Sequence, residues 1–453
     1  MRVALLSYRS KSHVGGQGVY VRHLSRELVA LGHDVEVLSA QPYPELDPGV
    51  RLTKVPSLDL YRDDDPFRTP HPRELLQRRD PVDLLELATM WLGRFPEPRT
   101  FALRVERLLR DRLVAEPAAR PHVVHDNQTL APGVLRLRHL GLPLVTTIHH
   151  PISHDRRVDL AAAPSRRRRQ ALKRWYSFVE MQARTARQVG RVLTVSRSSE
   201  ADIVRDFAVD PAAVTVVPLG VEEDVWAPPT GPRTPGRLVA MASADTPMKG
   251  VDVLLRAVAQ LRDRAATEGR TQPLELVLVS KPKPRGRTER LLDELDLGDV
   301  VRFVSGVSDA ELAALVGSAE IACVPSLYEG FSLPTAEAMS CGTPLVVSRA
   351  GAIPEVVGED GVCADLVPPG DVDALTDALE ALLADPERRA RLGAAGRARV
   401  LERFSWRAVA RATAAVYAEE IAASGHALPA DDPARTTADL IPSIPSPSLA
   451  GER

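Results

Sequence analysis

The chain contains two series of short aliphatic runs, and within each series the runs alternate with helical patterns. This alternation leaves few possible architectures. The runs before residue 226 read RVALLS, DVEVLS, HVVH, LVTTIH, VLTV and VTVVP, and those after residue 236 read RLVAMA, LELVLVS, VVRFVS, IACVP and PLVVS. Continuous apolar runs of this length between helices are typical of parallel strands that are buried on both faces. The sequence therefore predicts an α/β protein with two Rossmann-like, doubly wound domains facing a cleft.

A stretch dense in Pro and Gly, WAPPTGPRTPG, separates the two sets of runs and predicts a linker over residues 226–236. The expected domains are therefore residues 1–225 and 237–405. A last helical pattern occupies residues 406–422. The remainder, residues 423–453, is rich in Pro, Ser and Ala and has no periodicity, so we expect a disordered tail.

Composition excludes several classes of protein. The chain has 453 residues and a net charge of -2, which predicts no nucleic-acid binding. No apolar stretch approaches the roughly 20 residues that span a bilayer. The three cysteines form no CxxC pair, which argues against a zinc site or a disulfide framework and favours a reducing, cytoplasmic location. Only six of the 58 basic residues are lysines, so each lysine merits individual attention.

Ligands of open parallel sheets bind outside the carboxyl ends of the strands, and two stretches at such ends could hold an anion. After RVALLS comes SHVGGQGVY, in which Gly15 and Gly16 allow close backbone approach before a helix. After RLVAMA comes SADTPMKG, in which Lys249 directly precedes a helical pattern. A lysine beside free backbone N–H groups makes a strong phosphate site. A glycine turn and a solvated lysine remain the alternatives for these residues taken singly.

A third stretch, YEGFSLPTAE, follows the run IACVPS and contains two carboxylates eight positions apart, Glu329 and Glu337. Pro334 suits a first helical turn, so the N–H groups from Phe331 to Leu333 would face the cleft with the positive end of the helix dipole behind them. Carboxylates on either side of an anion site suit the hydroxyl groups that flank a diphosphate. A helix-capping Glu and an exposed Glu remain the alternative from these residues alone.

Taken together, these motifs resemble family-4 retaining glycosyltransferases of the GT-B fold. The matching stretches are GG-x-G-x-x-V near the start, VVPLGVEEDVW, PMKGVDVLLRA and YEGFSLPTAEAMSCGTPLVVS, which continues through GAIPEVVG. The longest of them carries that family's E-x7-E signature. The resemblance covers residues 1 to about 422 and is strongest over 236–410. It implies that the helix at 406–422 crosses back onto the first domain.

The resemblance also implies roles for individual residues around a nucleotide-diphosphate sugar. Glu329 would hold hydroxyls of the donor sugar, Lys249 would neutralise the leaving phosphate, and Glu337 would bind the ribose. The diphosphate would receive backbone hydrogen bonds from Phe331, Ser332 and Leu333.

In the first domain, the resemblance implies that Gly16 lets the backbone close onto the donor. It also implies that His149 lies near the reacting sugar carbon, although His150 beside it leaves that assignment open. Val307 would contact the base through backbone atoms. Under this reading the catalytic residues are His149, Lys249 and Glu329.

One position departs from the family pattern. Family members usually carry an arginine six residues before the lysine, and this chain has Ser243 there. We expect either a weaker phosphate site or a substitute cation from the stretch SKPKPRGR, namely Lys281, Lys283, Arg285 or Arg287.

The resemblance implies an enzyme that transfers a hexosyl unit from a UDP- or GDP-hexose to an unidentified hydroxyl, with retention of configuration. Because the leaving group is already a diphosphate, no general acid is needed, unlike in glycosidases. No metal and no further cofactor are expected, since no Asp-x-Asp motif occurs at a matching site. The alternatives are a catalytically weak sugar-nucleotide-binding protein and, less favoured, an epimerase or phosphorylase of the same fold.

The acceptor leaves little trace in the sequence. Residues 165–191 carry nine basic side chains against one acid, with Trp175, Tyr176 and Phe178 among them. Such a segment suits peripheral contact with an anionic membrane or binding of a phosphorylated acceptor. A solvated basic face over a packed helix is the alternative.

Overall fold

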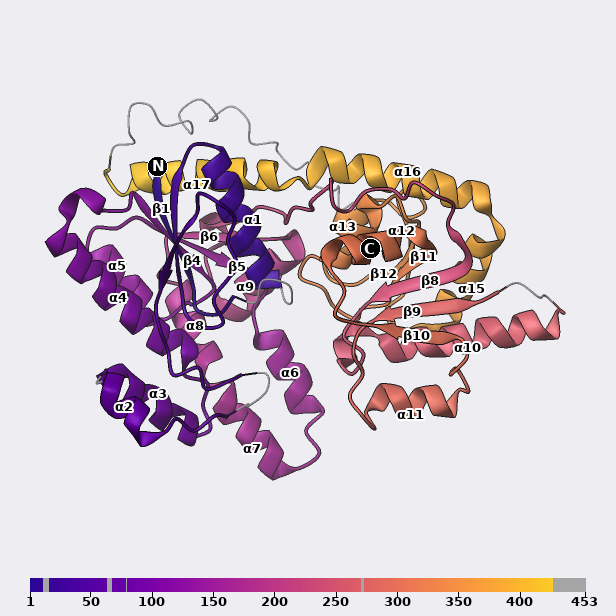
Figure 1. The fold of residues 1–453 in the computed structure, drawn as a ribbon, viewed down its shortest axis with the longest axis horizontal. Coiled ribbons are helices and arrows are strands. Elements are labelled where there is room, and N and C mark those ends of the chain that lie inside the picture. The colour runs from indigo at the N-terminus through magenta and orange to yellow at the C-terminus, as the bar shows by residue number, and fades with distance from the viewer. Residues whose placement is uncertain (11–15, 63–66, 79, 270–272, 427–453) are drawn as a thin grey trace, which may run out of the picture.

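Two parallel sheets, each covered by helices, lie side by side in the structure (Figure 1). The structure, a computed structural model, describes residues 1–10, 16–62, 67–78, 80–269 and 273–426. The seven-stranded sheet has the order β3-β2-β1-β4-β5-β6-β7 and the six-stranded sheet the order β10-β9-β8-β11-β12-β13. The predicted pair of doubly wound α/β domains is confirmed.

The strands of the first sheet are β1 (Arg2–Ser7), β2 (Asp34–Ser39), β3 (Arg51–Lys54), β4 (Val123–Asn127), β5 (Leu144–Ile148), β6 (Arg191–Thr194) and β7 (Val214–Val216). Those of the second are β8 (Thr234–Met241), β9 (Glu275–Val279), β10 (Val301–Val304), β11 (Ala319–Val324), β12 (Leu345–Ser348) and β13 (Asp365–Val367). The aliphatic runs did not predict β3 and β13. Both lie at the edge of a sheet; the side chains of β3 are half-buried or exposed, and β13 has only three residues.

The helices of the first domain are α1 (Gly16–Ala30), α2 (Pro72–Arg78), α3 (Pro81–Trp91), α4 (Glu97–Ala115), α5 (Pro132–His139), α6 (Ser153–Ala161), α7 (Arg166–Trp175), α8 (Phe178–Ala186) and α9 (Arg197–Phe207). Those that follow β8 are α10 (Val251–Thr267), α11 (Arg287–Glu294), α12 (Asp309–Ser318), α13 (Leu333–Ser340), α14 (Ile353–Val357), α15 (Val372–Ala384), α16 (Pro386–Arg403) and α17 (Trp406–Ala423). The short 3₁₀ turns are η1 (Pro117–Ala119), η2 (Pro211–Ala213) and η3 (Pro247–Lys249). No helix in the described ranges has both the length and the hydropathy needed to cross a bilayer.

The last helix, α17, returns from the second domain and lies along the first (Figure 1). Its Tyr417 is fully buried and lies 2.6 Å from His125 Nδ1 in β4. At the crossing point, the amide of Val221 donates to the carbonyl of Phe404 over 2.7 Å. Trp226 and Trp406 belong to one buried apolar cluster that includes side chains of both domains. The two domains are therefore packed together through α17 and the segment before it.

The second sheet begins inside the predicted linker, because Thr234, the first residue of β8, already pairs with Ala319 of β11. Residue 423, where the predicted tail begins, is the last residue of α17. Residues 427–453 of that tail lie outside the described residues.

Candidate functional site

The loops after β8 and β11 bring the two most distinctive side chains of the sequence into contact. Lys249 Nζ donates to Glu329 Oε1 over 2.7 Å, and Ser326 Oγ donates to the same oxygen over 2.7 Å. The Glu329 side chain is 10% exposed and that of Lys249 is 31% exposed. Residues 80 positions apart thus form a half-buried ion pair at the carboxyl ends of neighbouring strands.

Two glycines allow this contact through close backbone approach. Gly250 has φ +61°, and a Cβ there would lie 2.0 Å from the carbonyl oxygen of Pro325. Gly351 has φ +54°, and a Cβ there would lie 2.2 Å from the carbonyl oxygen of Glu329, which accepts the amide of Ala352 over 2.9 Å. Only glycine combines this backbone conformation with the absence of a side chain. The backbone positions of Lys249 and Glu329 are therefore fixed by close packing at Gly250 and at Gly351.

Helix α13 starts four residues after Glu329, and its start has the character of an anion site. Ser332 is the residue before the helix, with φ +83°, and its Oγ lies 2.7 Å from Thr335 Oγ1. The Ser332 side chain caps none of the helix amides, and Pro334 has no N–H of its own. Free amides at the positive end of a helix attract negative charge. The predicted backbone donors Phe331, Ser332 and Leu333 lie at this helix start.

Glu337 lies one turn further along α13 and is partly buried. Burial raises the pKa of this carboxyl to about 8, and the charge of Asp309 acts in the same direction. Asp309 begins α12, and the predicted base-contacting residue, Val307, lies two residues before it with 36% of its surface exposed. The Glu337 end of the site is therefore flanked by the loop that carries Val307.

The raised pKa of Glu337 predicts a pH-dependent stability. The folded protein keeps a proton on this carboxyl up to about pH 8, whereas the unfolded chain releases it near pH 4.5. Stability from this group is thus complete below about pH 4.5 and declines as the pH rises towards 8. We expect Glu337→Gln to remove this decline, so urea unfolding at pH 5 and pH 8 should show the variant gaining stability relative to wild type at the higher pH. A constant difference between the two proteins across this range would contradict the prediction.

On the first-domain side, His149 follows β5 and is buried. Its Nε2 lies 2.8 Å from Asn127 Oδ1, and its ring meets that of Tyr20 edge-on at 4.8 Å between centroids. Burial, followed by the charge of His150, lowers the pKa of His149 to about 3, so the imidazole is neutral. His150 is more exposed and lies 3.2 Å from Asp155 Oδ2. The two neighbouring histidines, which the sequence could not separate, thus have different surroundings.

Gly16, the other residue predicted in this domain, is the first residue of α1. The rest of its glycine turn, residues 11–15, lies outside the described residues.

Hydrogen bonds between the domains, which the sequence analysis did not predict, hold the loop next to Glu329. The Gly330 carbonyl accepts Ser196 Oγ over 2.6 Å and Ser199 Oγ over 3.1 Å, and Ser199 Oγ also lies 2.9 Å from the carbonyl of His149. This bridge joins the segment that carries His149 to the segment that carries Glu329. The sequence SRSSE signals a helix start, but nothing in it indicates a partner more than 130 residues away.

A second bridge between the domains is formed by backbone amides at the start of α9. The carboxylate of Glu355, on α14, accepts the amides of Arg197 and Ser198 over 2.8 Å each. An acidic side chain from the second domain thus satisfies two of the free amides at a helix start in the first domain. The described conformation therefore has its two domains in direct contact beside the predicted site.

Ser243, the position that departs from the family pattern, is exposed after β8. Asp245 nearby accepts the backbone amides of Lys283 over 2.7 Å and Thr288 over 3.1 Å, which ties the basic stretch to this loop. Of the candidate substitutes, Arg287 donates to Asp252 over 2.7 Å. The side chains of Lys281, Lys283 and Arg285 are exposed. The substitution by one of these cations stays a prediction.

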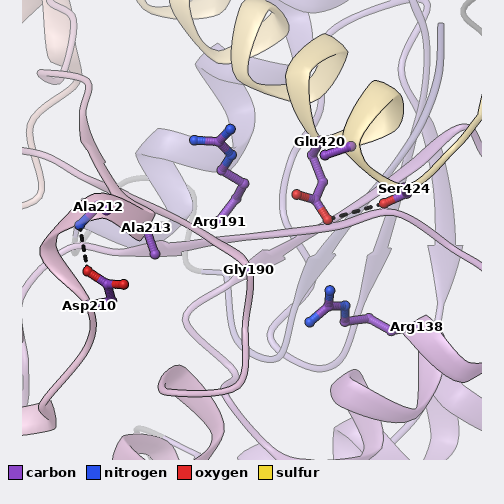
Figure 2. A pocket seen from close by; sticks show the side chains of 9 residues that line it. Arg138, Gly190, Arg191, Asp210, Ala212, Ala213, Glu420 and Ser424 are labelled. Carbon is purple, nitrogen blue, oxygen red and sulfur yellow. Dashed lines mark hydrogen bonds between the residues drawn. The ribbon is translucent and has the colours of Figure 1, made fainter.

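A cavity of about 460 Å³ lies at the opposite, amino-terminal edge of the first sheet (Figure 2). Arg138, Arg191 and Glu420 line it, with Gly190 directly before β6. None of the predicted catalytic or donor-binding residues lines this cavity. The candidate site is therefore the interdomain region around Lys249 and Glu329.

Two protein-family models match the chain over most of its length. Residues 14–225 match the family described as Glycosyltransferase Family 4, and residues 223–399 match Glycosyl transferases group 1. The MMP alpha-(1->4)-mannosyltransferase of Mycolicibacterium hassiacum is 57% identical over 423 residues, covering 93% of this chain and 99% of that protein. The glycogen synthase of Mycobacterium tuberculosis is 31% identical over 431 residues, covering 92% of this chain and 94% of that protein.

Solved structures share the fold at lower identity. Sucrose-phosphate synthase from Thermosynechococcus elongatus aligns with a TM-score of 0.69 at 24% identity, covering 93% of this chain and 99% of that chain. Anabaena Alr3699/HepE in complex with UDP-glucose aligns with a TM-score of 0.62 at 17% identity, covering 92% of this chain and all of that chain (100%).

Proposed function

The chain belongs to the group 1 glycosyltransferases of family 4, a retaining family of the GT-B fold, and from that premise we propose that it transfers mannose from a nucleotide-diphosphate mannose. The proposed donor is GDP-mannose, and the proposed product is an α-(1→4)-linked mannoside. The observation that carries the proposal is the 57% identity to a mannosyltransferase along almost the whole of both chains. The ion pair of Lys249 and Glu329 beside the start of α13 supports it with a site of the required chemistry.

In the proposed reaction, the bond between C1 of mannose and the β-phosphate oxygen breaks, and a bond from C1 to the acceptor hydroxyl oxygen forms on the same face. The acceptor proton passes to the departing phosphate oxygen. Negative charge grows on that phosphate, and the Lys249 ammonium and the free amides at the start of α13 would stabilise it. When the Lys249 ammonium pairs with the phosphate instead of with Glu329, the Glu329 carboxylate can accept hydrogen bonds from the sugar hydroxyls.

The neutral His149 would act beside the reacting carbon by hydrogen bonding rather than as a charged acid. Interdomain contacts around Gly330 would exclude water from the site and so limit hydrolysis of the donor.

A donor screen tests the proposal. The protein is incubated with GDP-mannose, GDP-glucose, UDP-glucose and UDP-galactose, and melting temperature and release of free nucleotide are measured. We expect GDP-mannose to raise the melting temperature most, because the proposed donor should bind the folded protein most tightly. A ligand at about 100 times its Kd adds about 2.7 kcal/mol to the stability of the folded state. With α-mannoside acceptors, NMR of the product should show a new α-(1→4) linkage.

Glu329→Gln serves as the control for this screen, because it changes one atom of the site and should suppress nucleotide release. Preference for UDP-glucose would contradict the proposed donor. Tight binding without turnover across a broad acceptor panel would instead favour a sugar-nucleotide-binding protein.

A further inference from the structure

Helix α3 buries two carboxylates beside the apolar side chains of Leu87 and Met90, and its outer face is apolar. Asp83 and Glu86 are almost fully buried and form ion pairs of 2.6 and 2.5 Å with Arg104 of α4. On the outer face, Leu84 is 62% exposed and Trp91 is 67% exposed, and Leu92 directly after the helix is 66% exposed. A single exposed leucine is common, but an apolar outer face opposite buried charges indicates a surface that meets something other than water.

Helix α7 carries an unusual group of cations. All six of its basic side chains are exposed, and in the described part of the chain none of them forms an ion pair. Several arginines elsewhere in this domain are paired, as Arg78 is with Asp83 and Arg112 with Glu36. The six residues concerned are Arg166, Arg167, Arg168, Arg169, Lys173 and Arg174. In a chain whose net charge is only -2, this concentration is a local feature rather than a general excess.

The two helices are neighbours in the fold. Trp175, at the end of α7, packs against Tyr61 and Phe95 with ring centroids 5.5 and 5.3 Å away. It joins the apolar cluster that contains Leu87 and Met90 of α3. Arg174 Nε lies 3.9 Å from the Cβ position of Gly93, just after α3. Figure 1 shows α3 and α7 at the end of the first domain opposite α17.

We propose that α3 and α7 form a docking surface for an anionic lipid membrane. Leu84, Trp91 and Leu92 would enter the interfacial region, and the cations of α7 would contact the headgroups. Helices that lie on membranes combine apolar and aromatic side chains with flanking Lys and Arg in this way. Charge favours a membrane over a second copy, because anionic headgroups would neutralise the six exposed cations of α7. This inference does not depend on which sugar the enzyme transfers.

Vesicle sedimentation of the full-length protein tests the proposal. The vesicles consist of phosphatidylcholine alone or mixed with an equal part of phosphatidylglycerol. We expect binding to the anionic vesicles only, and weakening as salt shortens the screening length. Because each cation near such a surface contributes about 1 kcal/mol, the triple variant R166Q/R167Q/R169Q should bind roughly 100-fold more weakly.

A matched control removes three exposed arginines from α16 and α17 on the other side of the molecule. R391Q/R407Q/R411Q has the same net charge as the α7 variant and should bind vesicles as wild type does. A second test variant, L84S/W91S, removes the apolar part. It changes only exposed positions, so the melting temperature and donor hydrolysis should remain unchanged while vesicle binding is lost.

Equal binding by the α7 variant and its control would overturn the proposal. Equal binding of wild type to neutral and anionic vesicles would overturn it as well. Sedimentation velocity provides a third readout: a dimer that L84S/W91S converts to monomers, without vesicle binding by wild type, would assign the surface to a second copy instead.

Discussion

Replacing Lys249 by alanine is expected to lower kcat for nucleotide release by about 100- to 1,000-fold, the usual effect of removing one group that stabilises developing negative charge. The ammonium lies 2.7 Å from Glu329 and next to the start of α13, where the diphosphate is proposed to bind. The side chain is 31% exposed, so its loss should change the melting temperature little. Single-turnover assays with GDP-mannose would separate the effect on chemistry from the effect on binding.

Lys54→Ala provides the matched control, because Lys54 is an exposed lysine of the edge strand β3. Wild-type turnover in Lys249→Ala would remove Lys249 from the catalytic residues. The same assay tests the proposed substitutes for the missing arginine at Ser243. A loss of donor affinity in Lys281→Ala or Lys283→Ala would support the substitution, whereas unchanged turnover and affinity in both would exclude these two lysines.

Replacing Gly351 by alanine is expected to lower both stability and activity, although the residue takes no part in the chemistry. The left-handed backbone costs a residue with a Cβ about 1–2 kcal/mol. In addition, the new Cβ would lie 2.2 Å from the carbonyl oxygen of Glu329, so this backbone must move. Displacement of catalytic groups by about 1 Å can cost about 100-fold in rate. Urea unfolding and steady-state kinetics of the variant measure the two effects.

Gly361→Ala is the matched control, because it introduces the backbone strain without a steric clash at the new Cβ. Gly361 also has a positive φ of +74°, but nothing lies within 4 Å of its Cβ position. We expect Gly361→Ala to lose stability to a similar extent through strain and to keep wild-type kcat. If Gly351→Ala retained wild-type kcat as well, the position of the Glu329 backbone would not be critical for transfer.

Much of the fold could be predicted from the sequence because buried parallel strands are encoded locally. The runs RVALLS and IACVP predict strands because their burial on both faces excludes polar residues, and both form central strands of their sheets. The edge strand β3, RLTK, carries no such signal. The burial of Asp83 and Glu86 in α3 could not be predicted either, since it depends on ion pairs with Arg104 of α4 and, for Asp83, also with Arg78.

The sequence by itself determined the architecture, the family and the local chemistry of YEGFSLPTAE, because helix starts, glycines and buried strands depend on neighbouring residues. The contact between Lys249 and Glu329, the different surroundings of His149 and His150, and the bridges from Ser196, Ser199 and Glu355 were decided by the tertiary structure alone. These features join segments separated by many residues along the chain or depend on which side chain becomes buried. Such distances and burial are set by the packing of the two domains, and no local pattern records them.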